Sequence, residues 1–557
     1  MKKEKLSVIK KNFDIPFKII LSLVIFSGFV FLIRVFDARA ETIQTSVSVG
    51  NAAPEFTVNP FEDPASSSTS PTNVGSNVTW KATAEDANGD DYYLIVCSTN
   101  SVSAGSGAPT CGATTWCTSS ATTSGQQASC NRTALAGDAH ENAWFAFVCD
   151  GIGAGAACST AHQGTGDSGS PFFVNHAPSF TAANNNSPQN PGVNITWTTT
   201  ASDPNNYDIK LLVCQSEGIS GGSCSGDEWC SSNFVASNPT CSYEIPIPTA
   251  AGSNNAYVYI IDEFNFPAGG QQGSNVPFNV NNVAPVVTAV TINGGSAITL
   301  EAGTTKAVSL TATVTDNNGF DDIASVLGYA YRSGVGFANC DSSGDADANN
   351  CYPEVSCSVD GTPSSTSADY ICTVNLQYFA DATVANTQFP DQNWLSTIRA
   401  VDDGSLSGSL EVPSGVNVNS LLAFDITESI NYGGRSVGFV TDLLDVVVTT
   451  TAIGNTGVDQ EHSGSPNMCV NFPACTGGTP IGVAFQRYAL SVSTAYSSGT
   501  ALSTTPADVF INVPKPTSTT ASTRNTWWGI EIPAGTEAGS YTGENTITGV
   551  VSDVEDW

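Results

Sequence analysis

The stretch at residues 92–130 reads YYLIVCSTNSVSAGSGAPTCGATTWCTSSATTSGQQASC and contains four cysteines, Cys97, Cys111, Cys117 and Cys130. An unbroken apolar run leads into the first cysteine, and residues rich in Gly, Ser and Thr fill the intervals between the others. The run is typical of a strand buried on both faces, and the intervals are typical of turns. We therefore expect a core strand followed by a loop that disulfides hold in place.

The same arrangement of cysteines occurs twice more along the chain. The middle pair of each quartet is six positions apart, while the outer gaps vary only between 10 and 15 positions. Fixed strands joined by turns of variable length produce such a pattern, so we interpret it as an internal repeat. The other quartets are Cys214, Cys224, Cys230 and Cys241, and Cys340, Cys351, Cys357 and Cys372.

Residues around the quartets indicate where each repeat begins. Trp80 and Trp197 each lie 17 positions before the first cysteine of their quartet, and an Asn-x-Ala-Pro phrase opens at Asn51, Asn175 and Asn282. Proline suits a linker or the start of a strand but not a central strand, so these phrases mark joints. We predict module one at 51–174, module two at 175–281, module three at 282–418 and a distinct C-terminal module at 419–557.

The repeat also predicts one disulfide. Module two has no counterpart of Cys149 or Cys158, so we expect these two to bond to each other and each quartet to pair within itself. Three connectivities remain open for every quartet. The C-terminal module contains only Cys469 and Cys475. A zinc site is disfavoured because tight Cys-x2-Cys pairs are missing from the sequence.

Short strands account for the rest of modules one to four. Val78, Trp80 and Ala82 alternate with polar residues, and the apolar runs at 144–149, 211–214 and 257–261 look like central strands. In the C-terminal module we expect strands at 443–448, 483–492, 509–513 and 527–532. No convincing amphipathic helix follows residue 41, so the predicted fold class is all-β, with tandem two-layer β-sandwiches and disulfide-stapled loops.

On the Asn-x-Ala-Pro openings and the acidic stretch at 84–91, which includes Asp86, the chain resembles the tandem immunoglobulin-like and fibronectin type III-like modules of bacterial cell-surface proteins. The resemblance covers most of residues 51–418 and implies β-sandwiches with structural or adhesive roles. The cysteine quartet departs from ordinary members of these families and implies an extra stapled loop in each module. A weaker resemblance, to cadherin-like repeats, implies calcium binding by acidic residues near module joints.

Pairs of aspartates recur at matching positions, five apart, just after the first long strand of each module. Such carboxylates could ligate Ca²⁺, which takes six to eight hard oxygen ligands. The alternative is that they cap turns through side-chain hydrogen bonds to the backbone. No other cofactor is expected. The candidate calcium ligands are Asp86 and Asp91, Asp203 and Asp208, and Asp316 and Asp321.

The N-terminus predicts export. Six lysines precede an uncharged apolar run at 19–33, and Ala38-Arg39-Ala40 follows as a small-x-small cleavage site. We expect residues 1–40 to be a signal peptide and 41–50 a linker, which makes the protein secreted or cell-surface. The alternative is an uncleaved single-pass anchor formed by residues 17–36. Either way, the cysteines lie in an oxidising compartment.

Charge excludes several partners. Residues 1–40 contain eight of the 18 Lys and Arg but only three of the 51 Asp and Glu, so the remainder has a net charge of −38 (10 − 48). Such a field repels phosphate backbones and anionic headgroups. We expect no nucleic-acid binding, and membrane contact only through the N-terminal segment if it is not cleaved.

The one segment that resembles a catalytic motif is at 166–171, which is similar to the nucleophile loop of serine proteases. His140 lies only 28 positions before Ser168, which leaves no room for a protease barrel between base and nucleophile. We therefore expect no enzyme and favour a structural or adhesion protein that contacts other cell-surface or matrix components. The alternative is a ligand- or glycan-binding protein that uses the stapled loops, and an unrecognised hydrolase is a minor one.

Overall fold

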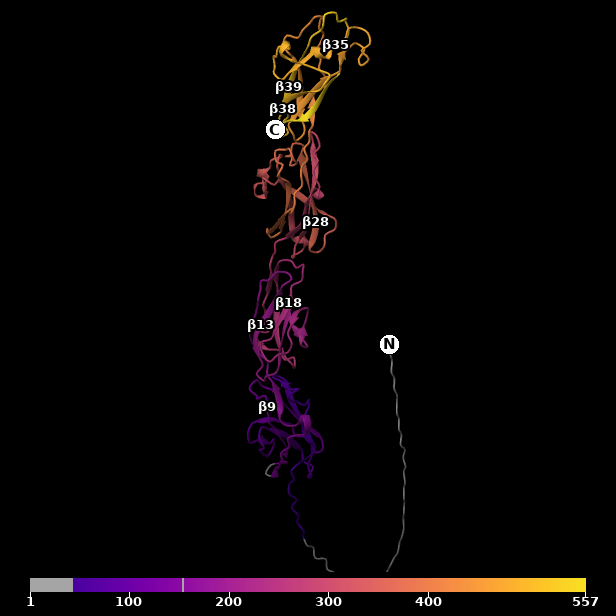
Figure 1. Cartoon of the computed structure of the whole chain (residues 1–557). Coiled ribbons are helices and arrows are strands. Elements are labelled where there is room, and N and C mark those ends of the chain that lie inside the picture. The colour runs from indigo at the N-terminus through magenta and orange to yellow at the C-terminus, as the bar shows by residue number, and fades with distance from the viewer. Residues whose placement is uncertain (1–43, 153–154) are drawn as a thin grey trace, which may run out of the picture.

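The computed structural model describes residues 44–557 except 153–154, so the predicted signal peptide or anchor lies outside the described residues. Four β-sandwich modules follow one another end to end in an extended rod (Figure 1). No helix in the described part of the chain is long and apolar enough to cross a membrane. Short 3-10 turns lie at Gly166–Ser168, Asn293–Gly295, Phe320–Asp322 (η4), Phe337–Asn339, Ser343–Asp345, Val483–Phe485, Tyr496–Ser498 and Val554–Asp556.

Module one packs a three-stranded layer, β1-β3-β8, against a second, β10-β4-β7, with the small sheet β2-β11-β9 at the edge and the hairpin β5-β6 in the stapled loop. The strands are β1 (Glu55–Glu62), β2 (Thr72–Asn73), β3 (Asn77–Glu85), β4 (Tyr92–Cys97), β5 (Val102–Ser103), β6 (Thr110–Cys111), β7 (Thr115–Thr118), β8 (Gln127–Thr133), β9 (Glu141–Asn142), β10 (Phe145–Asp150) and β11 (Phe172–Asn175).

Module two repeats this arrangement, with layers β18-β13-β12-β21 and β17-β14-β20-β22. Its strands are β12 (Ser179–Asn185), β13 (Asn194–Ser202), β14 (Ile209–Cys214), β15 (Ile219–Ser220), β16 (Ser223–Cys224), β17 (Glu228–Ser231), β18 (Thr240–Glu244), β19 (Gly252–Asn254), β20 (Tyr257–Asp262), β21 (Gly269–Gly270), β22 (Ser274–Asn275) and β23 (Phe278–Val280).

In module three one long strand, β27, joins the two layers. Its first half pairs with β26 and its second half with β28, so a single seven-stranded ladder, β24-β25-β28-β27-β26-β29-β30, folds over on itself. The strands are β24 (Val286–Ile292), β25 (Thr305–Thr315), β26 (Ile323–Arg332), β27 (Cys351–Asp360), β28 (Ser367–Gln377), β29 (Trp394–Asp402) and β30 (Ser407–Glu411).

The C-terminal module pairs the five-stranded sheet β31-β32-β39-β36-β37 with the three-stranded sheet β38-β33-β40. The predicted strand at 483–492 is only partly right, because residues 483–485 form a 3-10 turn and the strand ends at Ala489. The strands are β31 (Phe424–Ile426), β32 (Val446–Ala452), β33 (Val458–Gly464), β34 (Asn467–Met468), β35 (Ile481–Gly482), β36 (Gln486–Ala489), β37 (Thr500–Ala501), β38 (Ala507–Val513), β39 (Ser522–Ile530) and β40 (Asn545–Val551).

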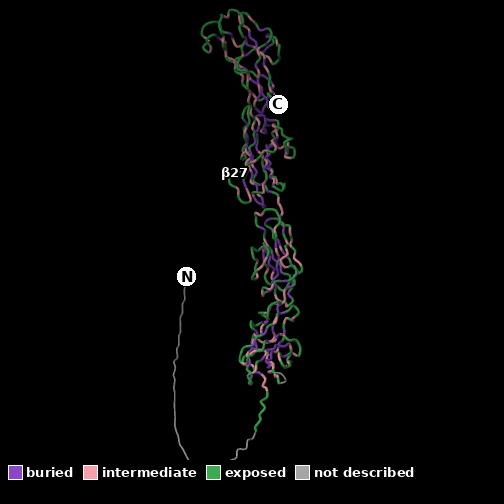
Figure 2. The backbone as a smooth tube through the Cα atoms, turned by 180° about the vertical axis from the view of Figure 1, so that it is seen from behind, coloured by how far each residue is buried: buried purple, intermediate pink, exposed green. Residues whose placement is uncertain are grey.

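Each module has its own apolar core, seen as separate buried stretches along the rod in Figure 2. The alternating residues of β3 and β13 point inward, and Trp80 and Trp197 are fully buried. Trp197 meets the ring of Phe278 edge-on, with centroids 5.6 Å apart. Module three has Leu310 at this position, and its buried tryptophan is Trp394 instead. The fold is therefore an all-β tandem of sandwiches.

Eight disulfides pair the cysteines as neighbours along the sequence, so each quartet bonds first to second and third to fourth; Cys149 bonds to Cys158 and Cys469 to Cys475. The two bonds of a quartet have different places. In module two, Cys214–Cys224 holds the hairpin loop against β14, whereas Cys230–Cys241 links β17 of one layer to β18 of the other.

This difference predicts unequal effects of removing the two bonds. They close loops of similar length, 10 and 11 residues, so by the chain-entropy model each contributes about 3 kcal/mol through the unfolded state. We expect the pair Cys230→Ser/Cys241→Ser to destabilise module two more than Cys214→Ser/Cys224→Ser, because both members of the first pair lie in the main core between the layers, whereas Cys224 lies at the margin of a smaller cluster. Calorimetric melts of the two variants measure the difference. Equal losses would contradict the assignment of the interlayer bond to the core.

Candidate metal centre

In modules one, two and three, the side chain of the opening asparagine is hydrogen-bonded to the last residue of a buried strand. Asn282 Nδ2 donates to Asp402 Oδ2 at 2.9 Å, and Asp402, which ends β29, is 2% exposed. The equivalent bonds join Asn51 to Asp150, at 2.7 Å, and Asn175 to Asp262, at 2.6 Å. The start of each module is thus tied directly to its core.

A second aspartate completes this end of the module. Asp316 follows β25 at once, and its Oδ1 accepts the backbone N–H of Asn318 at 2.7 Å. Asn318 Oδ1 in turn accepts the backbone N–H of Val283, the residue after the opening asparagine. The same chain of bonds occurs in the other two modules, through Asp86, Asn88 and Ala52 and through Asp203, Asn205 and His176. These aspartates therefore do form the side-chain-capped turns.

The turn uses only one oxygen of each aspartate. In all three modules the second oxygen of that aspartate and the side-chain oxygen of the opening asparagine are buried, and within the described residues they have no hydrogen-bond partner. A buried polar atom without a partner costs about 1–3 kcal/mol, so natural structures rarely keep one. The same two atoms recur at this position in all three modules, so the arrangement belongs to the repeat. The six atoms are Asn51 Oδ1, Asp86 Oδ2, Asn175 Oδ1, Asp203 Oδ2, Asn282 Oδ1 and Asp316 Oδ2.

Module three has the most complete cluster. Carboxylate oxygens of Asp316, Asp322 and Asp402 lie within 4.8 Å of one another, and Asp322 Oδ2 is also buried and unpaired. Burial raises the pKa of Asp316, and the Asp402 carboxylate raises it further. Burial and the charges of Asp316 and Asp402 raise the pKa of Asp322. Three clustered carboxylates repel one another, and a divalent cation that prefers oxygen ligands would remove that repulsion.

Modules one and two offer fewer charges at the same place. In module two, burial raises the pKa values of Asp203 and Asp262, and the Asp262 charge adds to the effect on Asp203. Module one has Asp86 and Asp150, which are 6% and 0% exposed. Each of these sites therefore combines two carboxylates with an asparagine oxygen, against three carboxylates in module three.

The predicted ligand set needs correction in its second members. Asp91, Asp208 and Asp321 are exposed, because five positions beyond the first aspartate the chain has already left the buried turn. Asp322, next to Asp321 on η4, is the residue that joins the cluster. The strand-end aspartates were missed, although an Asp ends the second buried apolar run of modules one and two at Asp150 and Asp262.

The joint between module three and the C-terminal module keeps the asparagine but not the acidic cluster. Asn455 Oδ1 accepts the N–H of Leu421, and its Nδ2 donates to the carbonyls of Ala380 and Asn419. Ile453 stands two residues before it, at the place that Asp316 has in module three. This joint therefore lacks the carboxylate that the other modules place there.

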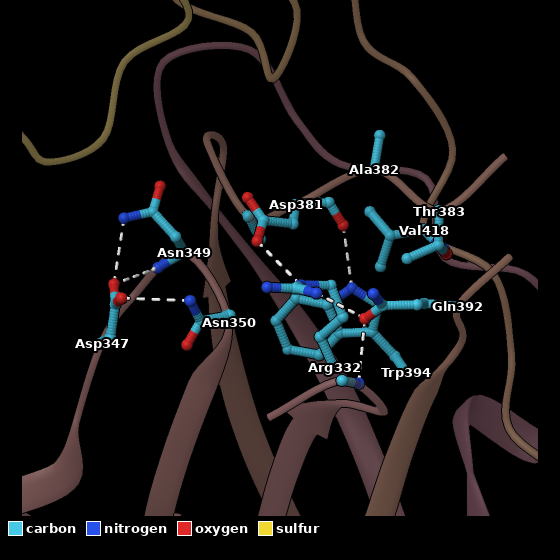
Figure 3. A network of polar contacts seen from close by, with 12 residues as sticks. Arg332, Asp347, Asn349, Asn350, Asp381, Ala382, Thr383, Gln392, Trp394 and Val418 are labelled. Carbon is cyan, nitrogen blue, oxygen red and sulfur yellow. Dashed lines mark hydrogen bonds and ion pairs between the residues drawn. The ribbon is translucent and has the colours of Figure 1, made fainter. Parts of the chain in front are cut away.

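Instead, a buried ion-pair network crosses this joint. Lys515 Nζ of the C-terminal module lies 3.0 Å from Asp381 Oδ1, and Arg332 Nε lies 3.0 Å from Asp381 Oδ2. Figure 3 shows the module-three part, in which Arg332 also donates to Gln392 beside Trp394. All three charged residues are at most 9% exposed. A lysine ammonium here supplies a positive charge from the chain itself.

In the protease-like segment, the serine hydroxyl bonds to a main-chain carbonyl rather than to a histidine. Ser168 Oγ donates to the carbonyl of Thr165 in the same 3-10 turn. His140 Nδ1 faces the carbonyl of Val174, and its Nε2 is 3.3 Å from the hydroxyl of Tyr207 in module two. His140 thus takes part in the joint between modules one and two.

No family model and no curated protein matches this chain. Among solved structures, titin domains I67–I69 share 9% identity, with 67% of this chain and 99% of that chain covered and a TM-score of 0.31. The mouse nectin-like molecule 4 ectodomain shares 9%, with 63% and 96% covered and a TM-score of 0.27. Protocadherin gamma B2 cadherin domains 1–5 share 12%, with 88% and 82% covered and a TM-score of 0.23. At these values no functional conclusion follows from the likeness.

Proposed function

We propose that this chain is an exported structural or adhesion rod of the cell surface or extracellular matrix, whose joints are stiffened by calcium. The end-to-end succession of stapled modules supports a spacer, because each bond limits loop motion without using a large core. The strongly acidic surface suits a soluble extended molecule that contacts other surface or matrix components.

The observation that carries the calcium proposal is the recurrence of the same unpaired buried oxygens at the start of modules one, two and three. Four oxygen donors in module three, from Asn282, Asp316, Asp322 and Asp402, provide a site to which backbone carbonyls and water would add the remaining ligands. Because affinity rises with the number of ligand charges, we expect module three to bind most tightly.

The sites of modules two and three contact the preceding module, which links ion binding to joint stiffness. Asn318, held by the Asp316 turn, donates through Nδ2 to the carbonyls of Thr249 and Asn281. Tyr207, in the Asp203 turn, donates to the carbonyl of Ser68 in module one. An ion that orders these turns therefore also orders the contact with the previous module.

Small-angle X-ray scattering tests this function. With calcium, we expect the chain from Glu41 onward to scatter as a rod of nearly fixed length. With EGTA, the mean maximum dimension should fall because the first joints bend, while the Lys515 joint stays straight. Identical scattering under both conditions would contradict calcium-dependent stiffening, and a compact particle under both would contradict the spacer role itself.

A further inference from the structure

An open seam lies between the two sheets of the C-terminal module. β31 is the last strand of its five-stranded sheet and β40 the last of its three-stranded sheet, so both have a free edge. Near one end the seam is closed. There the backbone of Gly549 in β40 lies so close to the ring of Phe424 in β31 that an added Cβ would collide with it. Beyond this point the sheets separate around a cavity of about 630 Å³.

The walls of this cavity are suited to aliphatic side chains. Ile426, Ile430, Met468 and Ile547 line it from the partly buried margin of the module's core, and Val448, which is 1% exposed, lines it from the core itself. Its floor is a closed polar network, in which Gln486 exchanges hydrogen bonds with Asn545 and accepts one from Tyr432. The cavity thus offers apolar contact along these walls, and its lining also includes two exposed carboxylates, those of Glu428 and Glu544.

The cavity lies at the far end of the rod. β40 runs from Asn545, which lines the cavity, to Val551, close to the C-terminus, and Figure 1 places the C-terminus at the junction with module three. Its Asn545 end therefore faces away from the rest of the molecule.

A segment with the residue pattern of a strand projects from the opposite end. Residues 44–50, QTSVSVG, are all exposed, and within the described chain no hydrogen bond or ion pair involves them. Val47 and Val49 are 86% and 78% exposed, and they alternate with Ser46 and Ser48. This period of two with β-branched residues on one face is the pattern of a half-buried strand.

We propose that residues 44–50 of one copy insert as an added strand into the seam of the C-terminal module of the next copy. Val47 and Val49 would enter the cavity, while the main chain of the segment pairs with the free edge of β40 on the Asn545 side of Gly549, where the seam is open. Main-chain hydrogen bonds to an exposed sheet edge supply affinity in such strand addition, and pockets for alternate side chains supply specificity.

The donor and the acceptor belong to different copies. Seven extended residues span about 24 Å, whereas one 11-residue strand of module three alone spans about 36 Å. The tail therefore cannot reach the far end of its own rod. A contact between unlike ends of identical chains does not close on itself, so it produces head-to-tail filaments. The uncharged tail also avoids the repulsion that the acidic surfaces exert on side-by-side packing.

Sedimentation analysis and negative-stain electron microscopy of the chain from Glu41 onward, in calcium, test this assembly. We expect concentration-dependent linear filaments for the wild type and for the control Ser46→Asp/Ser48→Asp, whose charges face solvent. The variant Val47→Asp/Val49→Asp adds the same charge on the inserted face and should weaken the dissociation constant of assembly by more than about tenfold. Neither variant alters the folded body, since the tail is exposed.

A synthetic peptide of residues 41–50 provides a second measurement. Added in excess, it should occupy the seam and shorten the filaments, whereas a peptide of scrambled order should not. A chain that stays monomeric, filaments that survive Val47→Asp/Val49→Asp unchanged, or equal effects of the two peptides would each overturn the proposal. A failure here leaves the calcium-stiffened joints untouched, because those are measured on single rods.

Discussion

Replacing Asp322 with asparagine is expected to abolish most of the calcium stabilisation of module three, while the same change at the adjacent Asp321 should leave it intact. Asp322 Oδ2 is buried, unpaired and part of the acidic cluster, and Asp321 is exposed. At calcium a hundredfold above its dissociation constant, binding stabilises the folded module by about 2.7 kcal/mol. Calorimetry with calcium and with EGTA measures this difference as a shift of one melting transition.

The direction in which Asp322→Asn changes the melting temperature without calcium distinguishes a metal site from a purely structural one. In EGTA, Asp322→Asn should melt at the same temperature as wild type or higher, because it removes repulsion from Asp316 and Asp402. A purely structural aspartate would lose stability under both conditions. Equal melting of wild type in calcium and in EGTA would contradict the site.

The pH dependence follows from the raised pKa values of Asp316 and Asp322. Without calcium, the folded state holds protons that the unfolded state has released, so its stability falls as the pH rises above about 4. With calcium the carboxylates must be ionised, so acid weakens binding. The melting difference between calcium and EGTA should therefore shrink as the pH is lowered from 7 to 5.

The second large effect is expected at the joint between module three and the C-terminal module. Asp381→Asn leaves Lys515 and Arg332 buried without their counter-charge, and breaking a buried ion pair in this way costs about 3–5 kcal/mol. Asp391→Asn, an exposed aspartate of the same module, serves as the control and should change stability little. Calorimetry of both variants gives the comparison.

A double-mutant cycle shows whether this network couples the two modules. Lys515→Met combined with Asp381→Asn should cost less than the sum of the single changes, since the pair then leaves no unmatched lysine. EGTA should not change this coupling, because the joint has its positive charge in the chain. Additive losses of stability would mean that Asp381 does not couple the two modules energetically.

Repetition in the sequence predicted the all-β fold well, because alternating residues such as Val78 and Trp80 and the apolar run at 92–97 became strands as expected. The strand at 483–492 was overextended, since an apolar pattern alone does not distinguish a strand from a 3-10 turn that leads into one. The crossing of β27 between layers could not be foreseen, because its two halves pair with the strands directly before and after it, β26 and β28, and sequence order does not show that these two strands belong to different layers.

The sequence predicted the first aspartate of each candidate site but not the aspartates that lie beside it in the fold. Local spacing singled out Asp86, Asp203 and Asp316, which the structure buries in turns. Their partners come from strand ends 59 to 86 positions later, and only the folded sheet brings Asp402 to Asp316. Pairing by sequence distance favoured Asp321 over Asp322, although a one-residue step on η4 decides which carboxylate reaches the cluster.

Equilibrium dialysis of the exported chain against radioactive calcium is the most direct test of cation-held joints. We predict at least one tightly bound ion per chain, lost in Asp322→Asn and kept in Asp321→Asn, with weaker binding at the sites of modules one and two. A chain that binds no calcium at millimolar concentration, or that binds it equally in both variants, would contradict the assignment.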